Sequence, residues 1–176
     1  NSLQKDEWLG QDMTVRLGYL DMKAEEINFE KKKIFINTLD LKDPYFAIYD
    51  YQGKKPPGPP VVKQVIHKPG DLKWNTEDWD ILVKKIELDN GTFQNDVQTD
   101  RKPLPYFDGD HLQFAKINAT IQNISWQKDT ISANVKISTR ERSGFTVKSM
   151  KADFTFHPNA MIFKNLELIT PHSRLT

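Results

Sequence analysis

The stretch that decides the fold runs from residue 129 to residue 139 and reads Asp-Thr-Ile-Ser-Ala-Asn-Val-Lys-Ile-Ser-Thr. Apolar side chains stand at Ile131, Ala133, Val135 and Ile137, and the residues between them are polar. Successive side chains of a β-strand point to opposite faces, so this alternation predicts a strand with one apolar and one polar face. Similar alternation recurs along most of the chain, and we therefore expect an all-β fold.

Steps of three residues interrupt the alternation at several places. Val147 is followed by Met150, and Phe163 by Leu166, where a regular strand would repeat after two residues. A β-bulge adds one residue to a strand and returns the next apolar side chain to the original face. Long, bulged strands with one apolar face follow. The candidate residues of that face in the C-terminal strands are Ile131, Val135, Ile137, Phe145, Val147, Met150, Phe154, Phe156, Met161, Phe163, Leu166 and Leu168.

Turn sequences separate the expected strands. Asn and Gly tolerate the positive φ of tight turns, so Asp89-Asn90-Gly91 is the strongest hairpin signal. The other signals are Gln52-Gly53, Arg142-Ser143-Gly144 and His157-Pro158-Asn159. Hairpins join antiparallel neighbours, which predicts an antiparallel sheet. The first dozen residues leave open a short helical turn carrying Leu3, Trp8 and Leu9.

The segment 54–78 interrupts the pattern. Prolines at 56, 57, 59, 60 and 69 remove backbone donors and exclude a central strand, so we expect a long, Pro-rich surface loop. The length of 176 residues suits one β-rich domain with this loop inside it. The chain begins with Asn1 and not Met, and we interpret it as a fragment of a longer protein.

Parts of the chain resemble one another. The segment from Leu39 to Phe46 is similar to the segment from Ile86 to Phe93, and Leu166-Glu167-Leu168 begins in the same way. The similarity indicates either a repeated unit of strand, turn and strand, or only the features that many β-hairpins share. Unequal spacing between the copies leaves both interpretations open.

Composition excludes several classes of function. The chain has 25 Lys and Arg against 24 Asp and Glu, and this near balance argues against nucleic acid as a partner. The absence of cysteine rules out disulfides, thiolate metal sites and a thiol nucleophile. No apolar run reaches the length of a membrane span, so we expect any anchor to lie outside this sequence.

The sequence also lacks a recognisable catalytic arrangement. Its four histidines show no metal-ligand spacing, and no nucleophile motif or phosphate-binding loop occurs. Asp108-Gly109-Asp110-His111 lacks the rest of a calcium loop and is interpreted as a solvated turn. We therefore expect no enzyme activity, no metal and no cofactor.

The apolar face must be covered, because a large apolar side chain gains about 1.5–3 kcal/mol on burial. A second sheet would produce a closed β-sandwich, in which case the chain would be an interaction or adhesin-like module. A bound hydrophobic ligand would instead occupy an open groove. Periodicity alone does not choose between them.

Three passages resemble the AsmA and TamB-like envelope proteins of Gram-negative bacteria. The first covers residues 15–51, with Lys33-Ile34-Phe35-Ile36 and then Leu39-Asp40-Leu41. The second covers 79–93 and ends in Ile86-Glu87-Leu88-Asp89-Asn90-Gly91-Thr92-Phe93. The third begins with Glu141-Arg142-Ser143-Gly144-Phe145 and ends in Leu166-Glu167-Leu168-Ile169-Thr170-Pro171-His172-Ser173, which is similar to phrases of the long TamB-like type.

This resemblance implies a curved, taco-like sheet with an apolar concave face. It also implies a periplasmic location, with attachment to the inner membrane through a segment absent from this sequence. Phospholipid acyl chains would be the ligands, carried between the inner and outer membranes, and outer-membrane assembly proteins would be a second class of partner. The family has no catalytic residues to transfer, and the resemblance adds no cofactor.

Overall fold

The structure, a computed structural model, describes residues 2–56 and 73–176. The described residues contain eleven strands and no helix, which confirms the all-β prediction. Two strands occupy the N-terminal region where the sequence left a short helical turn open. In chain order the strands are β1 (Ser2–Asp6), β2 (Gln11–Arg16), β3 (Tyr19–Asn28), β4 (Lys33–Lys42), β5 (Tyr45–Asp50), β6 (Asp80–Val97), β7 (His111–Gln127), β8 (Thr130–Glu141), β9 (Thr146–His157), β10 (Ala160–Ile169) and β11 (Arg174–Leu175).

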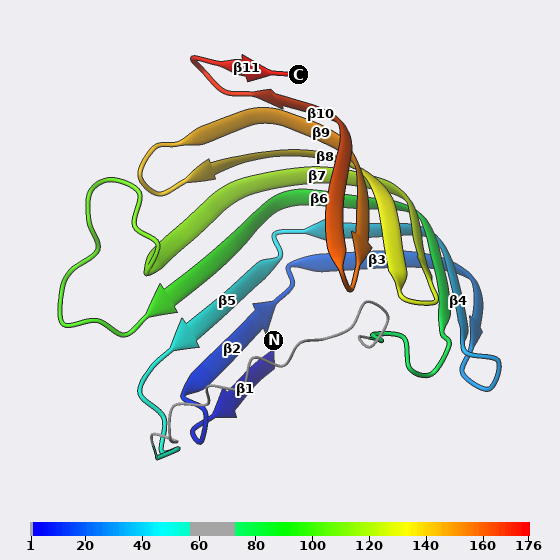
Figure 1. Cartoon of the computed structure of the whole chain (residues 1–176), viewed down its shortest axis with the longest axis horizontal. Coiled ribbons are helices and arrows are strands. Elements are labelled where there is room, and N and C mark those ends of the chain that lie inside the picture. The colour runs from blue at the N-terminus through cyan, green and yellow to red at the C-terminus, as the bar shows by residue number, and fades with distance from the viewer. Residues whose placement is uncertain (1, 57–72) are drawn as a thin grey trace.

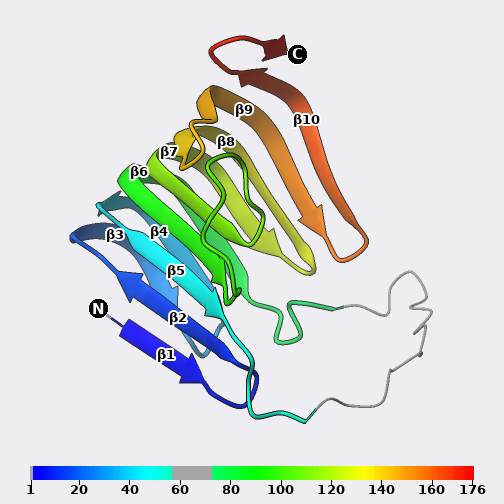
Figure 2. The same ribbon diagram turned by 90° about the vertical axis from the view of Figure 1, so that its left-hand side faces the viewer.

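All eleven strands belong to one open sheet, and Figure 1 shows that its long strands bend along their length. The strands are hydrogen-bonded in the order β1-β2-β5-β6-β7-β8-β9-β10-β11, while β3 pairs with β4 and β4 pairs with β6. The strand β6 is long enough to hold β4 along its first half and β5 along its second half. Figure 2 shows these strands side by side in a single layer.

The sheet is mixed, so the prediction of purely antiparallel strands was wrong. Both β4 and β5 run parallel to β6, whereas the other pairs are antiparallel. Parallel neighbours require a crossover connection of a dozen or more residues. The segment between Asp50 and Asp80 is such a connection. Residues 54–56 and 73–78 contain no strand, as expected, and the rest of the predicted loop lies outside the described residues.

Two of the four predicted hairpins are present. Arg142-Ser143-Gly144 joins β8 to β9, and His157-Pro158-Asn159 joins β9 to β10. Gln52-Gly53 instead follows β5 and leads into the crossover connection. Asn90-Gly91 lies inside β6, where Asn90 has φ 56° and the register with β7 shifts. The same positive φ that suits a hairpin also suits a bulge, and here the chain continues in the same strand instead of reversing.

The irregular positions are arranged in lines across the sheet. Asp43, Asn90 and Lys116, all with positive φ, interrupt three neighbouring strand paths at about the same level. The Asn90 side-chain amide donates to Asp43 Oδ1 at 2.5 Å, and Asn118 Oδ1 accepts from the Asn90 backbone N–H at 3.0 Å. Bulges bend a strand and increase its twist, so a line of bulges bends several strands together.

Candidate functional site: the apolar face of the sheet

Strand register arranges apolar side chains in rows that cross the sheet. One row runs from Ile81 in β6 through Trp126, Ile131 and Phe156 to Met161 in β10, each residue directly opposite the next. Residues directly opposite one another in a sheet share a face. The four rows that begin in β6 define the apolar face; their large members in β6 and β7 are Ile81, Val83, Ile86, Leu88, Ile121, Ile124 and Trp126.

Bulges keep successive rows on this face, as the three-residue steps predicted. The register between β9 and β10 shifts between Lys164 and Glu167, so Phe163 and Leu168 lie on the same side. The register between β8 and β9 shifts between Ile137 and Thr139, which brings Val147 to the side of Met150. In β7 the bulge at Asn123, with φ 53°, likewise keeps the apolar side chains before and after it on the same face.

The structure places nearly all of the predicted face residues together. Register assigns to one face Ile131, Val135, Ile137, Val147, Met150, Phe154, Phe156, Met161, Phe163 and Leu168. Leu166 lies within the bulge of β10, between paired residues. Phe145 precedes β9 in the turn that follows β8, is 49% exposed, and belongs to the end of the sheet and not to a row.

The apolar face is larger than the set predicted from the C-terminal strands. It continues through β6 and β7 to β4, where Ile34, Ile36, Leu39 and Leu41 lie opposite apolar residues of β6. Beyond the line of bulges at Asp43, Asn90 and Lys116, the face includes three phenylalanines. The ring centroids of Phe46 and Phe93 are 5.9 Å apart, and those of Phe93 and Phe114 are 6.4 Å apart. The alternation that identified the C-terminal residues is also present in these strands and could have found them.

This face lacks the cover that a closed domain would give it. Among the described residues, the buried apolar ones are Val83 and three alanines, at 119, 133 and 152. Larger side chains remain accessible, with Phe163 45% and Met161 56% exposed. A second sheet, which a β-sandwich would require, is not present in the part of the chain that the structure describes.

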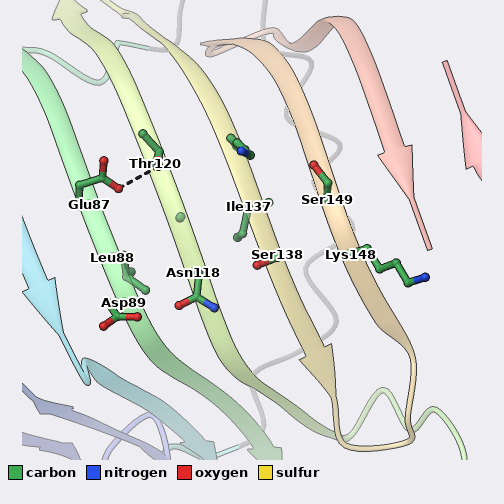
Figure 3. A pocket seen from close by; sticks show the side chains of 11 residues that line it. Glu87, Leu88, Asp89, Asn118, Thr120, Ile137, Ser138, Lys148 and Ser149 are labelled. Carbon is green, nitrogen blue, oxygen red and sulfur yellow. Dashed lines mark hydrogen bonds between the residues drawn. The ribbon is translucent and has the colours of Figure 1, made fainter. Parts of the chain in front are cut away.

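The opposite face is mostly polar, although it also carries Phe35, Leu82 and Ile162. Asn134 donates to Asp153 Oδ1 at 2.7 Å, and Asn165 donates to Asp153 Oδ2 at 2.6 Å. These two hydrogen bonds hold the pKa of Asp153 below its usual value. A hollow of about 460 Å³ lies on this face, and Thr120 donates to Glu87 Oε2 at 2.8 Å beside it. Figure 3 shows the side chains that line it.

Two buried carboxylates lie at the end of the sheet where β6 and β8 finish. The turn expected at Asp108-Gly109-Asp110 is present, but Asp108 is not solvated: it is 3% exposed and accepts hydrogen bonds from the two terminal nitrogens of Arg101 at 2.6 and 2.8 Å. Glu141, 1% exposed, accepts the Ser143 backbone N–H at 2.7 Å. Burial opposes its ionisation, but hydrogen bonds from Ser143 and the Gln113 backbone, with the charge of Arg142, together lower its pKa. Both carboxylates therefore stabilise the loops at this end of the sheet through hydrogen bonds.

Arg142 connects the same loops. Its guanidinium donates to the carbonyl oxygen of Leu104 at 2.8 Å and so joins the β8–β9 turn to the loop 98–110. In the described ranges, no group of three or more His, Cys, Asp or Glu is placed to hold a metal ion. No helix that could span a membrane is found there either.

Comparison with known proteins adds no relative. No protein-family model, curated protein or solved structure matches the chain.

Proposed function

We propose that the chain is part of an AsmA or TamB-like envelope protein that holds phospholipid acyl chains during transport between the inner and outer membranes. In this proposal the apolar face is the concave side of a taco-like sheet, and the chain works in the periplasm without catalysis. Attachment to the inner membrane comes from a segment outside this sequence, and outer-membrane assembly proteins are a second class of partner.

The observation that carries this proposal is the apolar face on a single-layer sheet. A closed module would bury its large apolar side chains against a second layer, whereas here Phe163 and Met161 are about half exposed. Contiguous exposed apolar surfaces of this kind mark sites of binding to proteins, membranes or ligands. Acyl chains fit such a face because they need only apolar contact, without hydrogen-bond partners.

A photo-crosslinker can test the proposal in cells. Placed at Val135, on the apolar face, it should capture phospholipid in the native envelope. Lys136 is the matched control, because it is the next residue of β8 and lies on the polar face. Capture of lipid at Lys136 as often as at Val135 would reject the proposal, and so would capture at neither position.

A further inference from the structure

One border of the apolar face carries an aromatic residue that does not belong to the sheet. Trp74 lies in the segment just before β6, and its ring packs against Phe156 with 4.2 Å between centroids and 61° between ring planes. Phe156 belongs to the outermost row of the apolar face, opposite Ile131 and Met161. The indole therefore takes a place that a ligand on this row would need.

Backbone hydrogen bonds fix Trp74 at this border. Asp129, in the turn between β7 and β8, accepts the backbone N–H of Trp74 at 2.8 Å and that of Asn75 at 3.2 Å. These two bonds stabilise the ionised carboxylate and hold the pKa of Asp129 below its usual value. A charged acceptor makes such bonds stronger than neutral ones.

Asn75 fastens the other side of the segment. It is 5% exposed, its amide donates to the carbonyl oxygen of Trp79 at 2.6 Å, and its side-chain oxygen accepts the Trp79 N–H at 2.7 Å. The Trp79 ring in turn makes an edge contact with Phe29, 6.1 Å between centroids. The segment is thus held at both the β7–β8 turn and the start of β6.

The middle of the row beneath this segment is sheltered from water, whereas its end in β10, Met161, is 56% exposed. The ring nitrogen of Trp126, which lies opposite Ile131 and Ile81, is buried and has no hydrogen-bond partner among the residues described. Buried polar groups of this kind are normally satisfied by protein or water. The cover at this border is therefore local: it lies over the middle of the row, and the β10 end of the row stays accessible.

We propose that Trp74 is a fixed stop for the ligand: it occupies the position over Phe156 and confines acyl chains to the rows from Phe154 onward. For its ligand, this inference rests on the proposed function. The position of the stop depends only on the contacts of Trp74, Asn75 and Asp129. The two parts can therefore fail separately.

The cover over Phe156 can be measured without lipid. Hydroxyl-radical footprinting of the purified chain should oxidise Phe156 several-fold faster in Trp74→Ala than in the wild type. Met161 is the internal reference, because it lies in the same row and is already 56% exposed. The variant Asp129→Ala keeps the indole but loses its anchor, and it should shift the oxidation of Phe156 in the same direction. Equal oxidation of Phe156 in all three proteins would overturn the stop.

The ligand arm uses a phospholipid with a diazirine on its acyl chain. In the wild type, adducts should form at Val135 and Phe154 and not at Phe156, and Trp74→Ala should add Phe156 to the set. The control Trp8→Ala removes a 57% exposed tryptophan from the β1–β2 turn and should leave the wild-type pattern unchanged. Adducts at Phe156 in the wild type, as frequent as at Phe154, would overturn the stop alone. A lack of adducts at every position would instead reject the acyl ligand and the proposed function.

Discussion

Phe46 of β5 and Phe93 of β6 stack with 5.9 Å between ring centroids and 25° between planes. They occupy the same position in two similar sequence segments, and the parallel register sets them directly opposite each other. The same register pairs Leu39 with Ile86. The internal similarity noticed in the sequence thus corresponds to two strand paths that lie side by side.

This stacking predicts energetic coupling between the two rings. The change Phe93→Ala should destabilise the fold by about 1–3 kcal/mol, less than for a fully buried phenylalanine. A double-mutant cycle with Phe46→Ala should give a coupling energy of about 0.5–1.5 kcal/mol, measured by urea unfolding. Phe107→Ala, at a 60% exposed loop position, should change stability by less than about 0.5 kcal/mol. Additive effects of the two ring deletions would contradict the coupling.

The third similar segment supports the same interpretation. Leu168 lies opposite Met150, and the row that contains both continues through Ile137 and Ala119 to Leu88. Leu88 and Leu168 therefore share a row, although three strands, β7 to β9, lie between them in the chain. The similar segments place corresponding leucines on the same row of the sheet.

Asn90 should contribute both a conformation and a hydrogen bond. It holds φ 56° inside β6, where alanine is disfavoured by about 1–2 kcal/mol. Asn90→Ala should therefore lower the unfolding free energy by about 1–2 kcal/mol, with loss of the bond to Asp43. Asn90→Gly accepts the same φ and should cost less, which separates the two contributions. If Ala and Gly were equally destabilising in urea unfolding, the backbone conformation would not be the cause.

The fold was predictable from the sequence where local pattern decides it. The alternation at 129–139 predicted β8, and the step from Phe163 to Leu166 predicted the bulge of β10. Strand direction was not predictable in this way, because it depends on the path of a connection. The crossover between β5 and β6 makes their pairing parallel, while Asn90-Gly91 has the same local preference in a hairpin and in a bulge.

The candidate site was predicted in part for a similar reason. Parity along each strand placed Val135 and Phe154 on one face, and the same parity could have added Phe93. The position of Trp74 could not be predicted from strand parity. Its contact with Phe156 depends on the hydrogen bond from the Trp74 N–H to Asp129, which no periodic pattern indicates.

Acidification should destabilise the protein partly through Asp108. The hydrogen bonds from Arg101, the largest influence, hold the pKa of this carboxyl well below its usual value. The stabilisation is therefore complete above about pH 4, the ordinary pKa of aspartate, and is lost as the pH falls toward the lower folded-state value. Asp108→Asn should flatten the decrease in urea midpoint between about pH 4 and pH 2.

The control for this measurement is Asp100→Asn in the same loop, at an exposed position. Its decrease in midpoint should follow that of the wild type. An unchanged slope in Asp108→Asn would show that the ion pair with Arg101 does not contribute to acid sensitivity.

Phe154→Asp distinguishes an open face from a covered one. The Phe154 ring contacts Phe163 at 5.3 Å and Phe156 at 6.0 Å between centroids, and no second sheet packs over it in the described part of the chain. A new carboxylate there should remain solvated, so we expect a loss of about 1–3 kcal/mol from the missing ring contacts and a retained β-sheet circular dichroism spectrum. Lipid capture by a crosslinker at Val135 should fall at the same time, because a charge interrupts the apolar row. Thr155→Asp, on the polar face, should keep both the fold and the capture. Under a closed layer, the same Phe154→Asp change would bury an unpaired charge at a cost of several kcal/mol and unfold a marginally stable domain. Loss of the β-sheet spectrum in Phe154→Asp but not in Thr155→Asp would therefore argue for a covered face and against lipid carriage.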